Sequence, residues 1–300
     1  MSEALTRGAS RLTRPAYAVR IAGPDARRFA NNMFTNNVRD MVVGAVNRHA
    51  YTDDRGRVQG FLDLICEGED AFVALHDGPV EPFLERFEKY IVFDDVEMTP
   101  QEGWVHHLVV GPEARGAVGF EVPDPGRVAM VNRAFGWFHA LGPNPTAAVS
   151  VVHPEADTLD VPRLTEDEFA LLRILAGHPV HPVDTGAKAL PHELGLRDVL
   201  LAFDKGCYLG QETINRVDVM GQVKRHLRVV LVDGVVDAEA DIQLDTKSVG
   251  RLTSPVALPN GRTVGLAILK AVASEPDTRV SVGDAQATVL VAPVAAERLG

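Results

Sequence analysis

The stretch "KGCYLGQE", from Lys205 to Glu212, holds one of only two cysteines in a chain of 300 residues. Gly206 and Gly210 flank Cys207 and permit backbone angles that other residues avoid. The thiolate is the reactive form of cysteine, and a nearby cation or helix N-terminus favours it. Lys205 supplies such a cation, and the following "QETINRVDV" is expected to be a helix. A small half-buried residue in a tight turn explains the same pattern, and on the residues alone this structural role is the more frequent one.

Composition and charge narrow the classes of protein to which the chain can belong. Hydrophobic residues make up 46% and charged residues 24%, which is typical of a folded soluble protein, and the length predicts two or three domains. The net charge of −11 disfavours general nucleic-acid binding, although a local basic patch is compatible with it. The N-terminus lacks an apolar signal segment, and no apolar run reaches the roughly 18 residues that cross a bilayer. With two isolated cysteines, we expect a cytoplasmic protein without a membrane partner.

Apolar periodicity predicts a mixture of helices and strands before residue 222. Helical spacing is present in three segments, 23–34, 79–93 and 164–177. The third begins with a capping box of Thr165 and Glu168, and its apolar stripe is expected at Leu171, Leu172 and Leu175. Strand patterns are expected in 17–23, 47–76 and, as short runs that include "AVGFEVP", in 104–162.

The pattern of apolar and turn residues changes after Gly221. Short β-rich runs such as "LRVVLVDG", "TVGLAILK" and "ATVLVAP" alternate with turn residues. This pattern predicts a small all-β domain from roughly residue 223 to residue 300.

Other chemically interesting residues give weaker patterns. Cys66 lies in the strand pattern "LDLICEG" and is expected in the core. His178, His181 and His192 share a Pro-rich loop, but their spacing matches no common metal site. Two cysteines also exclude a zinc or iron–sulfur site built from several cysteines of one chain, so we predict no metal site.

The motif "KGCYLGQE" resembles the K-G-C-[FY]-x-G-Q-E hallmark of the YgfZ family, folate-binding proteins related to the glycine-cleavage T-protein, an aminomethyltransferase. Four further stretches resemble the family in the same order, "IAGPDARRFANNMFTNNV", "FEKYIVFDDVEM", "PHELGL" and "VGRLTSP". The resemblance implies an α+β fold of three domains arranged as a ring around a central cavity. Residues 1–222 would form a folate-binding α+β region of two interleaved subdomains, and residues 223–300 a C-terminal all-β barrel.

The resemblance also implies a function and a cofactor. The cofactor would be tetrahydrofolate or a one-carbon-substituted form of it. The cellular role would be in iron–sulfur cluster assembly or repair, with assembly or client proteins as partners, and would indirectly support tRNA modification. Cys207 would be the functional thiol, and Lys205 would favour its thiolate form. The resemblance assigns the remaining motif residues to the turn or to the folate: Gly206, Gly210, Tyr208, Gln211 and Glu212.

The sequence departs from the T-protein at its acidic residues. The catalytic Asp-Asp pair of the transferase aligns with Gly60 and Phe61, and Leu175 stands in place of a glutamate. Asp63 follows Phe61 by two positions, which places both on one face of a strand and makes Asp63 a candidate folate contact. We therefore do not expect a T-protein type of aminomethyltransferase. A folate-dependent one-carbon transferase is the alternative and needs Asp63 as its acid, while a scaffold that has lost the ligand is a third hypothesis.

Overall fold

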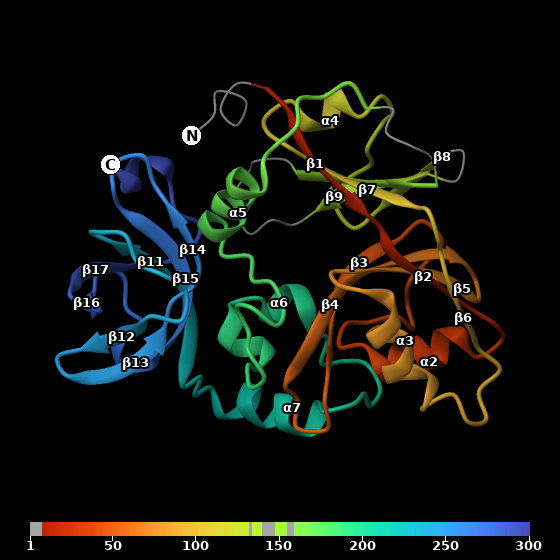
Figure 1. The fold of residues 1–300 in the computed structure, drawn as a ribbon. Helices are drawn as coiled ribbons and strands as arrows, with labels where there is room; N and C mark the ends of the chain where they lie inside the picture. The colour runs from red at the N-terminus through yellow and green to blue at the C-terminus, as the bar shows by residue number, and fades with distance from the viewer. Residues whose placement is uncertain (1–7, 132–133, 140–147, 155–158) are drawn as a thin grey trace. The chain divides into compact units, whose positions relative to one another are not determined.

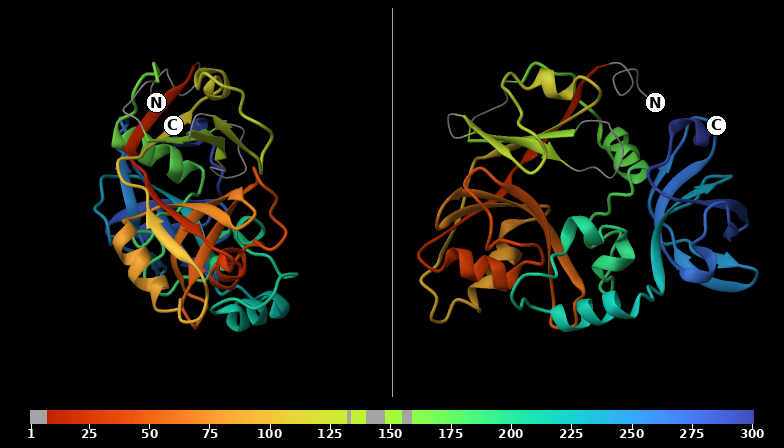
Figure 2. Two further views of the ribbon diagram at one scale, coloured as in Figure 1. Left: turned by 90° about the vertical axis from the view of Figure 1, so that its right-hand side faces the viewer. Right: turned by 180° about the vertical axis from the view of Figure 1, so that it is seen from behind.

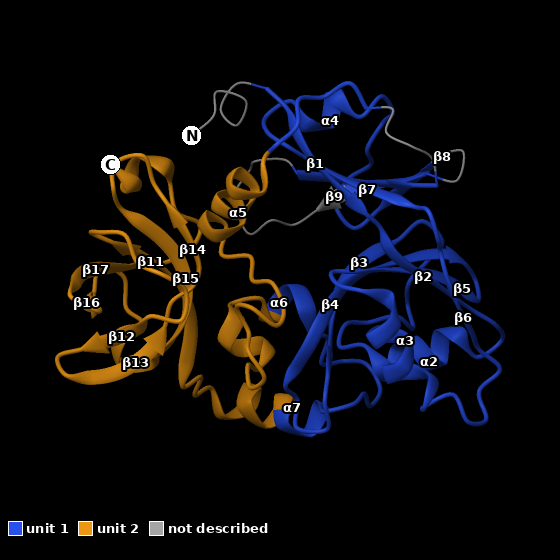
Figure 3. Cartoon of the chain, in the orientation of Figure 1, with its two compact units in different colours: residues 1–140, 145–164, 198–213 blue, residues 141–144, 165–197, 214–300 orange. Residues whose placement is uncertain are grey.

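A computed structural model describes residues 8–131, 134–139, 148–154 and 159–300. Contacts divide the chain into two units, which Figure 3 colours separately. Unit 1 comprises the described residues of 1–140, 145–164 and 198–213, and the described residues of unit 2 are 165–197 and 214–300. Two helices cross the division, α6 (Arg197–Leu200) and α7 (Gln211–Met220). Along the described ranges, no helix is long and apolar enough to span a membrane.

The first sheet of unit 1 carries two helices on one of its faces (Figures 1 and 2). It is antiparallel, with the strand order β3-β4-β5-β2-β6. The strands are β2 (Tyr17–Ala22), β3 (Val46–Thr52), β4 (Val58–Gly68), β5 (Ala71–His76) and β6 (Glu97–Pro100). The helices are α2 (Ala26–Met33) and α3 (Val80–Glu88). The strands predicted within 17–23 and 47–76 are thus present.

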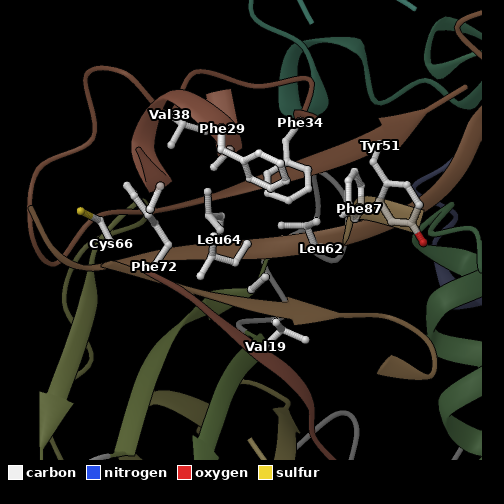
Figure 4. Close-up of a cluster of buried hydrophobic side chains, with 14 of the residues drawn as sticks. Val19, Phe29, Phe34, Val38, Tyr51, Leu62, Leu64, Cys66, Phe72 and Phe87 are labelled. Carbon is white, nitrogen blue, oxygen red and sulfur yellow. The ribbon is translucent and has the colours of Figure 1, made fainter. Parts of the chain in front are cut away.

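Alternate side chains of β4 point to opposite faces of the sheet and belong to two different apolar clusters. Leu62, Leu64 and Cys66 face the helices and join an apolar cluster with α2 and α3, which Figure 4 shows. Ile65 faces the other way, into a second cluster. Cys66 is fully buried, as predicted from its strand pattern. The period of two therefore decides which β4 side chains pack under helices and which pack against the second sheet.

The second sheet of unit 1 packs against the face of the first sheet that the helices leave uncovered. Its strand order is β1-β7-β10-β9-β8, and all its pairs are antiparallel. The strands are β1 (Ser10–Pro15), β7 (Val105–Val110), β8 (Val128–Val131), β9 (Ala134–His139) and β10 (Ala148–His153). Trp104, Phe135 and Trp137 fill the space between the sheets. A short helix, α4 (Ala114–Ala117), follows β7.

Unit 2 is built around a seven-stranded antiparallel sheet. Its order is β13-β12-β16-β17-β11-β15-β14. The strands are β11 (Arg225–Val232), β12 (Asp241–Leu244), β13 (Lys247–Arg251), β14 (Thr253–Ala257), β15 (Thr263–Lys270), β16 (Arg279–Val282) and β17 (Ala285–Leu290). The two edge strands, β13 and β14, are joined by the single buried residue Leu252, so the sheet curls back as a half-barrel. A β-rich region after residue 223 is therefore present, while the domain boundary at 222/223 stays a prediction.

Helical elements of unit 2 complete its second apolar cluster. Helix α5 (Glu166–Leu175) begins with the predicted capping box, in which the Thr165 hydroxyl accepts from the backbone N–H of Glu168. Its buried apolar residues include Ile174 and Leu175, which pack on strands β11 and β15. Three 3₁₀ helices are also present, η1 (Pro191–Leu194), η2 (Ala271–Ala273) and η3 (Ala296–Leu299).

Three predicted elements differ from the structure. The segment "AVGFEVP" is not a strand: α4 ends at Ala117, Gly119 has φ +76°, and the segment still buries Val118 and Val122 in a local core. Helix α3 ends at Glu88, before the residues predicted to complete it. Leu172 does not join the fully buried side of α5, because Phe169 and Ile174 occupy it instead.

Candidate functional site

The loop that carries the motif is fixed at its start by a buried lysine. We call residues 204–210, between α6 and α7, the motif loop. Lys205 is only 7% exposed, and its Nζ donates hydrogen bonds to the carbonyl oxygens of Phe34 at 2.5 Å and Asn36 at 2.6 Å. These two acceptors lie in the segment that follows α2. The motif loop is thereby tied to residues far from it in sequence.

A threonine between those two acceptors strengthens the attachment. The buried Thr35 hydroxyl donates to the Leu200 carbonyl at 2.6 Å and accepts from the Ala50 N–H at 3.0 Å. The Thr35 carbonyl accepts from the Ala202 N–H at 3.1 Å. The segment after α2 thus lies between strand β3 and the chain that enters the motif loop, with its polar groups paired.

The end of the motif loop is held by α2 and by the end of β3, and it packs closely on the turn that follows β3. The Leu209 N–H donates to the carbonyl of Asn32 at 3.2 Å, and the Thr52 hydroxyl donates to the Leu209 carbonyl at 2.6 Å. Gly210 has φ +84°, and a Cβ at this position would overlap the backbone oxygen of Asp53. Glycine is required here both for the backbone angle and for the close approach.

Cys207 lies exposed between these two attachments. Gly206 is exposed as well, and a Cβ built on it would approach only the Asn31 amide, at 3.9 Å. Space is therefore left open at Gly206, the residue that precedes the cysteine. Helix α7 begins at Gln211, whose N–H donates to the Tyr208 carbonyl at 3.1 Å. The motif loop presents a cysteine on a backbone that hydrogen bonds hold at both ends.

The ammonium group of Lys205 is buried and makes its hydrogen bonds inside the protein. Burial lowers the pKa of Lys205 to about 7, because the charged form loses its water. Its Nζ lies 5.0 Å from the ring centroid of the buried Tyr208. Its hydrogen bonds run to the segment after α2, so its predicted effect on the Cys207 thiolate stays a prediction. Tyr208 likewise has its ring in the interior, and its contact with a folate stays a prediction.

The two polar residues that close the motif are more accessible. Glu212 is exposed in the first turn of α7, where a carboxylate is favoured by the helix dipole. Gln211 is half-buried. The motif loop and the first turn of α7 therefore offer a thiol, an amide and a carboxylate on one short stretch of chain.

Asp63 lies inside unit 1 on the same face of β4 as Phe61, as predicted. One oxygen of Asp63 accepts from Arg48 Nη1 at 3.0 Å and the other from Trp137 Nε1 at 3.1 Å. Arg48 also forms a short ion pair with Asp77, and its Cζ lies 5.7 Å from the Phe61 ring centroid. Burial opposes the charge of Arg48, but the two carboxylates outweigh it and raise its pKa. Asp63 is thus a buried partner of Arg48.

Sequence reasoning missed the residues behind the motif loop. Buried His49 accepts from the Asn36 N–H through Nδ1 at 3.0 Å, and burial followed by the charge of Lys205 lowers the pKa of His49 well below its usual value. Asn36 also donates from its amide to the carbonyls of Arg48 at 3.0 Å and Val199 at 2.9 Å. The run "TNN", which follows the helix predicted over 23–34, is the one sequence feature that could have pointed to them.

The histidine loop of unit 2 has structural partners. His181 Nδ1 lies 2.7 Å from the Thr185 hydroxyl, and His192 Nε2 lies 3.5 Å from Asp218. Leu175, at the position of a T-protein glutamate, packs in the apolar cluster of unit 2. Among the residues that the structure describes, no group of three or more His, Cys, Asp or Glu side chains is placed to hold a metal ion.

Comparisons with known proteins give relatives over most of the chain. No family model matches the sequence. The tRNA-modifying protein YgfZ of Escherichia coli (strain SMS-3-5 / SECEC) is 26% identical over 295 residues, which cover 91% of this chain and 89% of that protein. The tRNA-modifying protein YgfZ of Colwellia psychrerythraea is 23% identical over 218 residues, covering 70% and 67% of the two chains.

A solved structure resembles this chain in fold. The glycine cleavage system aminomethyltransferase T from Bartonella henselae superposes with a TM-score of 0.78, covering 95% of this chain and 86% of that one. At 15% identity, this likeness concerns the fold, a mixed arrangement of helices and sheets. Together, the comparisons confirm the resemblance predicted from the motif, to the YgfZ proteins in sequence and to the T-protein aminomethyltransferase in fold.

Proposed function

We propose that this chain is a tetrahydrofolate-binding accessory protein of the YgfZ type with Cys207 as its functional thiol. It would act in iron–sulfur cluster assembly or repair and thereby support tRNA modification indirectly. The observation that carries the proposal is the exposure of Cys207 on a loop whose two ends are fixed by hydrogen bonds. Fixed, accessible side chains on loops are typical of functional sites. The relatives named as tRNA-modifying proteins support the same role.

Two kinds of thiol chemistry fit this position. The thiolate of Cys207 can ligate an iron–sulfur cluster that a second molecule also holds, since the other cysteine, Cys66, is buried in the core. It can instead exchange with a disulfide or a persulfide, where access of the attacking sulfur decides the rate. Both need the sulfur to be reachable from solvent.

The residues around Cys207 fit a folate only in part. Gly206 leaves open space, and Gln211 and Glu212 offer an amide and a carboxylate for the N–H groups of a reduced pterin. Tyr208 is buried, and Asp63 already accepts hydrogen bonds on both oxygens. We therefore propose that the accessible set contacts tetrahydrofolate or its one-carbon form. In the proposed arrangement, the domains form a ring, a β-barrel closes it, and the folate lies in its central cavity.

Folate binding is tested on the purified full chain. Isothermal titration with tetrahydrofolate is combined with thermal unfolding, since a ligand that binds the native state raises the melting temperature. At 100 times the Kd, the expected stabilisation is about 2.7 kcal/mol. Glu212→Gln is expected to weaken binding about tenfold, while the matched control Glu85→Gln on the exposed side of α3 leaves it unchanged. Absence of any binding heat with wild type would sink the folate part of the proposal.

The thiol is tested separately from the ligand. Cys207→Ala and Cys207→Ser both remove the nucleophile at an exposed position, so neither is expected to alter stability by more than about 0.5 kcal/mol. A strain that lacks its own protein of this type and shows reduced iron–sulfur enzyme activity is then complemented with each variant. Both variants are expected to fail while still binding tetrahydrofolate. Full complementation by either would exclude the thiol role.

A further inference from the structure

A pocket of about 940 Å³ lies at the start of β11 and the end of β15 in unit 2. Three basic side chains line it, together with one histidine and one carboxylate: Lys224, Arg225, Lys270, His226 and Glu193. All of its lining residues belong to unit 2. With His226 neutral, the charges in the lining sum to about +2, in a chain whose net charge is −11. The pocket lining is therefore positively charged, although the protein as a whole is acidic.

The strand register places two of these cations opposite one another. Arg225 and Lys270 are direct partners across the antiparallel pair of β11 and β15. Like charges directly opposite one another destabilise a sheet. Lys224 adds a third cation next to this pair, whereas the hollow holds a single carboxylate. Glu193 pairs with Arg225, so the charge that a bound anion would compensate is mainly that of the two lysines.

The one carboxylate of the pocket is already fully used. Glu193 accepts from Arg225 at both oxygens, from Nε and from Nη2, at 2.8 Å each. It also accepts from the backbone N–H of Leu190 at 2.9 Å. Glu193 is 6% exposed and fixes the orientation of the Arg225 guanidinium. Because its charge is paired with Arg225, it compensates the charges of the two lysines only weakly.

Several donors remain for a ligand. Within the described ranges, Lys224 Nζ has no hydrogen-bond partner, and neither has Nη1 of Arg225. Lys270 makes one hydrogen bond, to the Ser248 carbonyl at 2.8 Å, and keeps further N–H groups. His226, which is half-buried, also lines the pocket. The guanidinium that Glu193 holds in place can donate oriented hydrogen bonds to a ligand, and the two lysines contribute positive charge.

From these observations we propose that the pocket is a binding site for a multiply charged phosphate ligand. Lysine and arginine together recognise phosphate oxygens by charge and by hydrogen bonds. The volume is within the range of sites for small molecules, so it accommodates more than one phosphate group. This inference does not depend on folate binding or on Cys207. The phosphates can belong to a free small molecule or to an RNA strand, and the chemistry of recognition is the same.

Inorganic pyrophosphate is the probe for this site. Isothermal titration at low salt compares the wild-type chain with Lys224→Gln/Lys270→Gln, which removes two exposed charges and leaves the Arg225–Glu193 pair intact. The pocket pair is expected to weaken binding by tenfold or more. The control is Arg279→Gln/Arg298→Gln, which removes two exposed charges of unit 2 away from the pocket and is expected to change binding less than twofold.

Two results would overturn the proposal. The first is that the wild-type chain does not bind pyrophosphate. The second is that the pocket pair and the control pair lose affinity equally, which would mean that only net charge matters. A second titration with a short single-stranded RNA distinguishes the sources of phosphate. RNA binding that is lost in the pocket pair identifies strand phosphates as the ligand. Binding of pyrophosphate alone identifies a small free anion. Thermal unfolding of each variant checks that the fold is retained.

Discussion

Replacing Lys205 with methionine tests whether a buried ammonium group holds the motif loop. Burial lowers the pKa of Lys205 from 10.5 to about 7 in the native chain, whereas the unfolded chain keeps the ordinary value. Below pH 7, both states carry the proton, and the native state bears the full cost of burying it. Between pH 7 and 10.5, the unfolded state binds the proton more strongly, so the stability of the native state rises with pH.

The size of the effect follows from the two pKa values. Their separation corresponds to about 5 kcal/mol of native-state cost, which is relieved progressively above pH 7. From pH 7 to pH 9, the native state is expected to gain about 2 kcal/mol from this group, and from pH 6 to pH 7 less than about 0.5 kcal/mol. Methionine has no proton to release. Its loss of the two hydrogen bonds to Phe34 and Asn36 adds a cost that does not change with pH.

Urea unfolding at pH 6, 7, 8 and 9 measures this difference. Trp104 and Trp137 both lie in unit 1, so tryptophan fluorescence follows the unit that contains Lys205. The matched control is Lys89→Met, since Lys89 is an exposed lysine of the same unit. We expect the free energy of unfolding of wild type minus that of Lys205→Met to grow by about 2 kcal/mol from pH 7 to pH 9, while the Lys89→Met profile stays parallel to wild type. A difference that is constant from pH 6 to pH 9 would refute the reasoning.

Three further predictions concern the glycines of the motif loop, the two cysteines and the start of α5. Gly210→Ala is expected to cost at least about 2 kcal/mol, from its positive φ and the steric overlap, while Gly206→Ala costs less than about 0.5 kcal/mol; equal urea midpoints would contradict this. Iodoacetamide should add one group to the native chain, at Cys207, and a second at Cys66 only after unfolding; mass spectrometry of peptides decides it. Thr165→Ala should lower the free energy of unfolding by about 1 kcal/mol through loss of the capping box, and no change in a urea titration would argue against it.

Local patterns predicted the local structure well. Apolar patterns predicted four of the five strands of the first sheet, all but β6, and the burial of Cys66, and the Thr165–Glu168 spacing predicted how α5 begins. These features depend on residues a few positions apart. The end of α3 and the irregular segment after α4 were not predicted, because they depend on how the chain packs against distant elements.

The attachment of the motif loop had no local signal at all. Lys205 is bonded to carbonyl oxygens about 170 residues earlier in the chain, and backbone carbonyls leave no trace in a sequence. The pattern therefore suggested a cation for the neighbouring thiol, whereas the structure shows a cation that attaches the loop. The resemblance to a family proposed the site, and the structure shows which of its residues face solvent and which hold the backbone.

The position of Asp63 bears directly on the chemistry that this site can perform. A general acid must carry a proton on one oxygen, but both oxygens of Asp63 accept hydrogen bonds, from Arg48 and from Trp137. A proton on either oxygen would have to point at a donor N–H or displace it. Removing the carboxylate would also leave a buried Arg48 with one fewer partner, at a cost of about 3–5 kcal/mol. The geometry therefore argues against Asp63 as the acid of a one-carbon transferase, and the exposed thiol of Cys207 stays the proposed functional group of the motif.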